Sequence, residues 1–121
     1  MSKVLLVEDD VWLAELECAV LRDAGHEVRT APNALEAIEM IDAELPEVLV
    51  LDVLLAGTTA FALLHELQSY GDTGGIPIVL CTNIAEQLDA TKLEHYGVKR
   101  VVDKTTATPD DIAAAVKAAL L

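Results

Sequence analysis

The chain has 121 residues, of which 53% are hydrophobic and 3% aromatic, and its formal net charge at pH 7 is −13. This length predicts one domain with a hydrophobic core of its own, and the apolar content excludes an intrinsically disordered chain. An acidic surface disfavours binding to nucleic acids or anionic membranes, because Lys and Arg side chains provide most of the attraction to phosphate groups.

The sequence also carries no signal for export or membrane insertion. The N-terminal residues run directly into a predicted strand, and no uncharged apolar run approaches the ~18 residues that a membrane helix needs. Cys18 and Cys81 have neither CxxC nor zinc-binding spacing and are predicted to be buried thiols in a reducing compartment. We therefore expect a cytoplasmic protein.

Short apolar runs alternate with segments of helical periodicity along the chain. In chain order, we predict a strand at 4–7, a helix at 11–24, a strand at 27–31, a helix from 34 that ends before Pro46, a strand at 48–52, a helix at 60–69, a strand at 77–81, a helix at 85–96, a strand at 98–103 and a helix that begins at Pro109. Residues 57–59 are predicted as a loop.

Local signals support these boundaries. The unbroken apolar run at 48–51 is typical of a strand that is buried on both faces of a parallel sheet. Gly25 and Gly97 follow predicted helices, Asn33 is a suitable N-cap, and Thr108 precedes a proline in the first turn of the last helix. In the first helix, the spacing of Leu13, Leu16 and Val20 predicts the buried face.

These alternating units predict an α/β fold: a doubly wound (βα)5 open parallel sheet with helices on both faces. The chain contains no internal repeat and no linker long enough to separate domains. We therefore expect residues 1–121 to form a single domain.

Polar residues lie at the ends of the predicted strands, and they are the candidate functional residues of the chain. Glu8 and Asp9 follow the first strand, Asp52 ends the third, Thr82 follows the fourth and Lys104 follows the fifth. Because the carboxyl ends of parallel strands meet at one edge of the sheet, we expect these side chains to share a crevice. Three neighbouring carboxylates repel one another unless a cation intervenes, and oxygen ligands of this kind suit Mg²⁺.

This pattern resembles the receiver domain of two-component response regulators over essentially the whole chain. Segment 4–10 is similar to the family's opening strand with its acidic pair, and segment 52–57 is similar to the loop after its phosphoacceptor. Segment 76–82 is similar to the strand with the family's switch hydroxyl, and segment 103–104 is similar to the site of its lysine. The resemblance implies a flavodoxin-like sheet of order 2-1-3-4-5. It also implies that Asp52 accepts a phosphoryl group from a sensor histidine kinase or a histidine phosphotransfer protein.

The resemblance assigns further roles around Asp52. Mg²⁺ would be held by Asp9, Asp52 and the Leu54 backbone carbonyl, with Glu8 acting through water. Such a domain is a signalling phosphoacceptor, with at most self-phosphoryl transfer and autodephosphorylation, and not an enzyme in the usual sense. An α/β phosphatase would need a second aspartate two residues after the first, where this chain has Leu54.

The resemblance also predicts how the signal is read. Lys104 and the Thr82 hydroxyl would bind phosphoryl oxygens, and movement of Thr82 would change the surface that a downstream protein recognises. That protein is expected on the face formed by the fourth helix, fifth strand and fifth helix, or on the first helix. Whether the chain is a stand-alone regulator or part of a longer one stays open.

Several positions depart from the family's pattern. Val101 stands where an aromatic switch residue is usual. Thr105 follows the lysine where proline is usual, so the peptide bond between Lys104 and Thr105 is expected to be either trans with a remodelled loop or a strained cis bond. These departures leave one alternative open, a phosphorylation-independent (pseudo-receiver) binding module. Leu54 and Ile84, both apolar and near the expected path of an attacking water, predict slow hydrolysis of the phosphorylated form.

Overall fold

The computed structural model describes residues 2–52, 54–55, 58–69, 73–82, 90–104 and 106–121. Its main sheet contains five parallel strands in the order β2-β1-β3-β6-β7. The strands are β1 (Lys3–Val7), β2 (Glu27–Ala31), β3 (Val48–Asp52), β6 (Ile78–Thr82) and β7 (Val98–Asp103). Counted within this sheet alone, the order is 2-1-3-4-5, so the predicted fold class and strand order are confirmed.

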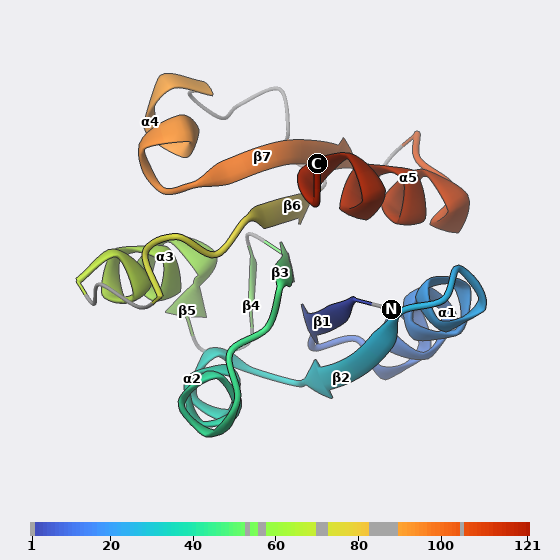
Figure 1. Ribbon diagram of the computed structural model, residues 1–121, viewed down its shortest axis with the longest axis horizontal. Coiled ribbons are helices and arrows are strands. Elements are labelled where there is room, and N and C mark those ends of the chain that lie inside the picture. Colours follow the sequence, from blue (N-terminus) through green and yellow to red (C-terminus); the bar gives the residue numbers. More distant parts are fainter. Residues whose placement is uncertain (1, 53, 56–57, 70–72, 83–89, 105) are drawn as a thin grey trace.

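Helices cover both faces of the sheet. They are α1 (Val11–Asp23), α2 (Ala34–Ala43), α3 (Ala60–Gln68), α4 (Ala90–His95) and α5 (Pro109–Ala119). Figure 1 shows α1 and α5 on one face, with α2, α3 and α4 on the other. No helix in the described part of the chain is long and apolar enough to cross a membrane.

Strand β3 shows why an unbroken apolar run belongs at the centre of this sheet. Val48 and Val50 pack into the core beneath α1 and α5, whereas Leu49 and Leu51 pack into the core beneath α2 and α3. All four are at most 1% exposed. Full burial of such a side chain contributes about 1.5–3 kcal/mol, so both faces of the strand stabilise the fold.

The predicted helix caps are present. Asn33 Oδ1 accepts a hydrogen bond of 2.9 Å from the backbone N–H of Glu36 at the start of α2. Asp111 Oδ2 accepts one of 2.8 Å from the backbone N–H of Thr108, which precedes Pro109 at the start of α5. These contacts satisfy backbone donors that have no partner inside the helix, and they fix where each helix begins.

The buried face of α1 differs from the prediction. Leu16, predicted to face the core, is 51% exposed, whereas Glu17, Cys18 and Leu21 are buried. Two apolar stripes compete on this helix, and its packing against β2 and α5 turns the second one inward. As a result, Glu17 lies in the interior of the domain.

Two further differences lie near the carboxyl edge of the sheet. Residues 58–59, predicted as a loop, form β5 (Thr58–Thr59), which pairs antiparallel with β4 (Leu54–Leu55). The fourth strand of the main sheet covers Ile78–Thr82, one residue later than predicted.

Of the helix predicted at 85–96, residues 85–89 lie outside the described residues, and Gly97 follows it with a φ of 84°.

Candidate functional site

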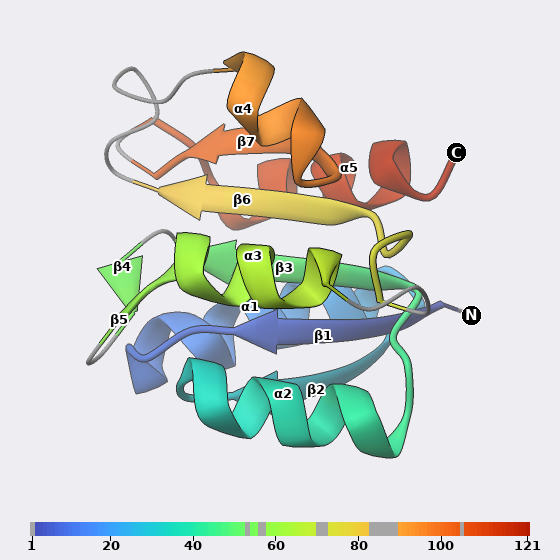
Figure 2. The same cartoon turned by 90° about the vertical axis from the view of Figure 1, so that its left-hand side faces the viewer.

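The polar residues predicted from the strand ends lie at one edge of the sheet. Figure 2 shows the arrowheads of the sheet strands pointing to the same side of the molecule. The strand register keeps these ends level, because Asp52 pairs with Cys81 and Thr82 pairs with Asp103. Parallel pairing therefore brings together residues that are far apart in the sequence.

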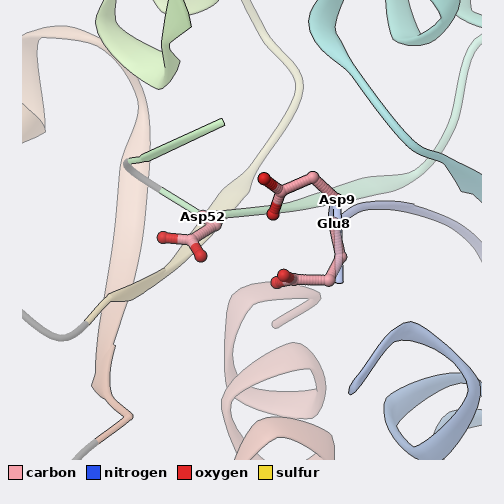
Figure 3. A group of neighbouring side chains, drawn as sticks. All are labelled: Glu8, Asp9 and Asp52. Carbon is pink, nitrogen blue, oxygen red and sulfur yellow. The ribbon is translucent and has the colours of Figure 1, made fainter. Parts of the chain in front are cut away.

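Three carboxylates from β3 and from the loop after β1 face one another. One oxygen each from Glu8, Asp9 and Asp52 lies within 4.8 Å of the other two. Figure 3 shows the side chains of Glu8 and Asp9 extending toward the side on which Asp52 lies. A set of closely spaced carboxylate oxygens fits a hard divalent cation such as Mg²⁺. Leu54 begins β4, where it pairs with Thr59.

Lys104 joins two of these carboxylates. Its ammonium donates to Asp52 Oδ2 at 2.6 Å and to Glu8 Oε2 at 2.9 Å. Its backbone N–H donates to the carbonyl of Thr82 at 2.9 Å, which ties the loop after β7 to the end of β6. Burial alone lowers the pKa of Lys104, but the hydrogen bonds to Asp52 and Glu8 outweigh it and raise that pKa above its ordinary value. The ammonium is therefore charged at neutral pH.

Glu8 is the most enclosed of the three acids. Its side chain is 2% exposed, and its second oxygen, Oε1, accepts a hydrogen bond of 3.2 Å from the backbone N–H of Asp10. Burial raises the pKa of Glu8, and Lys104 offsets only part of that effect. Asp10 in turn caps α1, since its Oδ1 accepts from the backbone N–H groups of Trp12 and Leu13. Hydrogen bonds to Lys104 and to the start of α1 thus fix the loop that carries Glu8, Asp9 and Asp10.

Of the residues on β6 and β7 that are predicted to read or transmit the phosphorylation signal, Thr82 and Val101 differ in burial. Thr82 is fully buried at the end of β6, beside the loop that carries Lys104. Val101 lies on β7 and is 40% exposed. Thr105 and Ile84 lie outside the described residues, so the peptide geometry and the hydrolysis rate predicted from them stay predictions.

Sequence reasoning missed Glu17 of α1. This residue is 1% exposed, and neither carboxylate oxygen has a hydrogen-bond partner within the described residues. Burial, followed by the nearby charge of Glu8, raises the pKa of Glu17 to about 7. A signal was present, because Glu17 shares a helical stripe with Cys18 and Leu21.

The two cysteines are buried and free, as predicted. Cys81 lies on β6 opposite Asp52, and burial, with a further contribution from Glu17, raises the pKa of its thiol to about 12. A thiol in this setting is a packing group and a poor nucleophile at neutral pH.

Comparison with known proteins adds an independent observation. A family model described as the response regulator receiver domain matches residues 4–117. The chain is 24% identical over 104 residues to protein PilH of Pseudomonas aeruginosa, with 86% of each chain covered. It is 31% identical over 120 residues to the phosphate regulon transcriptional regulatory protein PhoB of Rhizobium meliloti, covering 99% of this chain and 52% of that protein. The chain thus spans most of PilH but about half of PhoB.

Solved structures show the same relationship. The receiver domain of NtrX from Brucella abortus superimposes with a TM-score of 0.84 at 28% identity, with 97% of each chain covered. A putative response regulator from Chloroflexus aurantiacus gives a TM-score of 0.82 at 31% identity, covering 99% of this chain and 98% of that one. Both likenesses extend over at least 97% of this chain.

Proposed function

Since the chain belongs to the family of response regulator receiver domains, we propose that Asp52 accepts a phosphoryl group from a sensor histidine kinase or a histidine phosphotransfer protein. The observation that carries this proposal is the contact of 2.6 Å between Lys104 Nζ and Asp52 Oδ2 in a cluster with two further acids. On this proposal, residues 1–121 are a single receiver domain that works in the cytoplasm as a signalling phosphoacceptor. Two-component signalling is the setting that the family implies.

The proposed transfer uses groups that already lie near one another. An Asp52 oxygen forms the new P–O bond while the N–P bond of a phosphohistidine breaks and returns its electron pair to the imidazole nitrogen. Lys104 then pairs with one phosphoryl oxygen, and the Thr82 hydroxyl donates to another. Phosphoryl transfer depends mainly on positioning and charge neutralisation, and these side chains provide both.

Glu8, Asp9 and Asp52 are the side chains that would hold Mg²⁺, with the Leu54 carbonyl as a further ligand. Their oxygens suit the ion, which when bound would neutralise charge between Asp52 and the incoming phosphoryl group. Glu8 is buried and hydrogen-bonded to Lys104 and to the backbone of Asp10, which favours an indirect role through water.

We propose that movement of Thr82 toward the phosphoryl group carries the signal to a protein partner. The partner would bind the face formed by α4, β7 and α5, or α1, where Trp12 is 83% exposed. Val101 supplies no aromatic ring, so the change would be transmitted through Thr82 and Lys104. With a net charge of −13, the domain itself is not expected to bind nucleic acid or anionic membranes.

The test is incubation with acetyl phosphate and Mg²⁺, followed by intact mass measurement. We expect wild type to gain one phosphoryl group and Asp52→Asn to gain none. Asp42→Asn, an exposed acid on α2, is the matched control and should behave as wild type. If wild type gains no phosphoryl group from acetyl phosphate or from a histidine kinase, the phosphorylation-independent binding module is the better description.

A further inference from the structure

The positive charge of this acidic chain is concentrated in its last third. Five of its eight basic residues lie there, whereas most of its 21 acids come earlier in the sequence. The five are Lys92, Lys99, Arg100, Lys104 and Lys117. Lys104 is bound to Asp52 and Glu8 at the carboxyl edge of the sheet, but Lys99 and Arg100 are consecutive exposed residues of β7.

Lys99 and Arg100 are not neutralised by acids of the same chain. In the part of the chain that the structure describes, neither side chain forms an ion pair. The Arg100 guanidinium donates to the backbone carbonyl of Lys99 at 2.9 Å, which leaves most of its N–H groups available to another acceptor. Both cations can therefore pair with carboxylates of a second molecule, and such charge-assisted hydrogen bonds are among the stronger ones.

The two cations lie at an edge of the sheet beside an apolar side chain. Strand β7 is the last strand of the sheet, next to β6 (Figure 1). All residues of β6 are buried, whereas Lys99, Arg100 and Val101 are exposed, Val101 by 40%. Arg100 pairs with Val79 and Val101 pairs with Leu80, two residues that belong to the cores on opposite faces of the sheet. Lys99, Arg100 and Val101, here called the edge patch, thus join two positive charges to an apolar surface around the edge.

The geometry of β7 disfavours a partner that adds a further strand to the sheet. Its register against β6 skips Lys99, which lies between the partners of Ile78 and Val79. Such a bulge, and a lysine on an edge strand, both oppose pairing with another strand. A partner is therefore expected to contact the edge patch through side chains.

The many acids of the chain do not cancel this local charge. Neighbouring strands lie ~4.8 Å apart, so β2, four strands from β7 at the opposite edge, is ~19 Å away. The Debye length at physiological ionic strength is ~8 Å, so the acids of β2 and α2 are largely screened at the edge patch. A nucleic acid would extend over the acidic surface as well, whereas a short acidic segment of a protein would contact the patch alone.

We propose that the edge patch binds an acidic segment of a partner protein that also carries an apolar side chain. Carboxylates of the segment accept hydrogen bonds from Lys99 and Arg100, and its apolar side chain packs against Val101. This inference rests on the proposed function, because it names the chemistry of the partner that binds the face formed by α4, β7 and α5.

The probe is a short synthetic peptide of glutamate and serine with one central leucine, and the matched neutral peptide has glutamine in place of each glutamate. Titration of the unphosphorylated protein, followed by amide NMR at physiological ionic strength, should show that the acidic peptide binds at millimolar concentration. The shifts should centre on Lys99, Arg100 and Val101, and the neutral peptide should not bind. Equal binding of the two peptides, shifts centred elsewhere, no binding of the acidic peptide, or tighter binding of a single-stranded oligonucleotide would overturn the proposal.

Variants separate the charge of the edge patch from its apolar part. Lys99→Gln with Arg100→Gln should weaken binding of the acidic peptide at least about tenfold, because hydrogen bonds between charged groups are lost. Lys3→Gln also removes an exposed cation, at the start of β1, and should bind the peptide as wild type does. Val101→Ala changes a side chain that is 40% exposed, so it should fold, and it should weaken binding severalfold by reducing the apolar contact.

The same double variant separates this proposal from the proposed phosphorylation. Lys99→Gln with Arg100→Gln should gain a phosphoryl group from acetyl phosphate as wild type does, since neither residue belongs to the Asp52 cluster. The peptide titration uses the unphosphorylated protein, so its result does not depend on phosphoryl transfer. Unchanged affinity for the acidic peptide in the double variant contradicts the assignment of the edge patch, whatever the outcome of phosphorylation.

Discussion

The Lys104 ammonium donates a hydrogen bond of 2.6 Å to Asp52 Oδ2. The two residues lie 52 positions apart, at the ends of β7 and β3, with β6 between these strands. The same ammonium donates to Glu8 at 2.9 Å, so one cation partly neutralises two of the three clustered acids. The lysine therefore stabilises an arrangement that would otherwise be opposed by like charges.

The first prediction concerns this lysine and the stability of the fold. Lys104→Met should lower the free energy of unfolding by about 3 kcal/mol at pH 7, because it leaves Glu8 buried without its cation. The loss should be smaller at pH 4, where Glu8, whose pKa is raised by burial, is largely protonated. Urea unfolding at the two pH values measures both quantities.

Lys3→Met is the matched control for Lys104→Met. Lys3 pairs with Glu44 at 2.7 Å, but both side chains are nearly half exposed. Exposed ion pairs contribute little to stability because water and salt screen the two charges, so this variant should unfold almost as wild type does. Equal losses in the two variants would show that the burial of Glu8 has no energetic consequence.

The second prediction concerns Mg²⁺. Addition of Mg²⁺ should raise the thermal unfolding temperature of wild type, because a cation relieves repulsion among Glu8, Asp9 and Asp52. Asp9→Asn should weaken Mg²⁺ affinity by roughly tenfold or more, since even the loss of an outer-shell partner costs this much. Calorimetric titration measures the affinity, with Asp42→Asn as the control of equal charge change. An unaltered affinity in Asp9→Asn would exclude this residue as a ligand.

The third prediction concerns Glu17 and pH. The pKa of Glu17 rises from an ordinary value of 4.5 to about 7 in the folded chain, chiefly through burial. An acid with a raised pKa destabilises the fold only when it is ionised, so the effect is absent below pH ~4.5 and complete above pH ~7. The shift corresponds to about 3 kcal/mol at pH 8.

Glu17→Leu should therefore increase the free energy of unfolding by about 3 kcal/mol more at pH 8 than at pH 4. Urea unfolding at the two pH values gives this difference directly. Glu15→Leu removes a neighbouring exposed acid and should show little dependence on pH. A difference between the two pH values that is the same for both variants would contradict a special environment for Glu17.

The fourth prediction concerns the lifetime of the phosphorylated form. On the family resemblance, Leu54 and Ile84 would lie near the path of an attacking water, and their apolar side chains could not orient it by a hydrogen bond. The double variant Leu54→Asn with Ile84→Glu should therefore hydrolyse its aspartyl phosphate faster than wild type. Loss of the phosphoryl mass with time, after removal of the donor, measures the rate. Asp42→Asn again provides the control, and an unchanged or slower rate in the double variant would rule the idea out.

Local signals in the sequence were sufficient for most of the elements. The bounds of β2, β3 and β7 agree with the predicted ones, and the caps at Asn33 and Thr108 are present. These features depend on neighbouring residues, through apolar periodicity and through hydrogen bonds that span three positions. The clustering of Glu8, Asp9 and Asp52 was also predictable, because parallel strands carry their carboxyl ends to one edge.

Only the tertiary structure decided which face of α1 is buried and how Lys104 divides its hydrogen bonds. The sequence of α1 carries two apolar stripes, and the packing of the helix on β2 and α5 selects the one that contains Glu17. The sequence determined that a lysine follows β7, but the packed sheet edge determined that it joins Asp52 to Glu8. Both outcomes depend on contacts between distant segments, which periodicity within one segment does not encode.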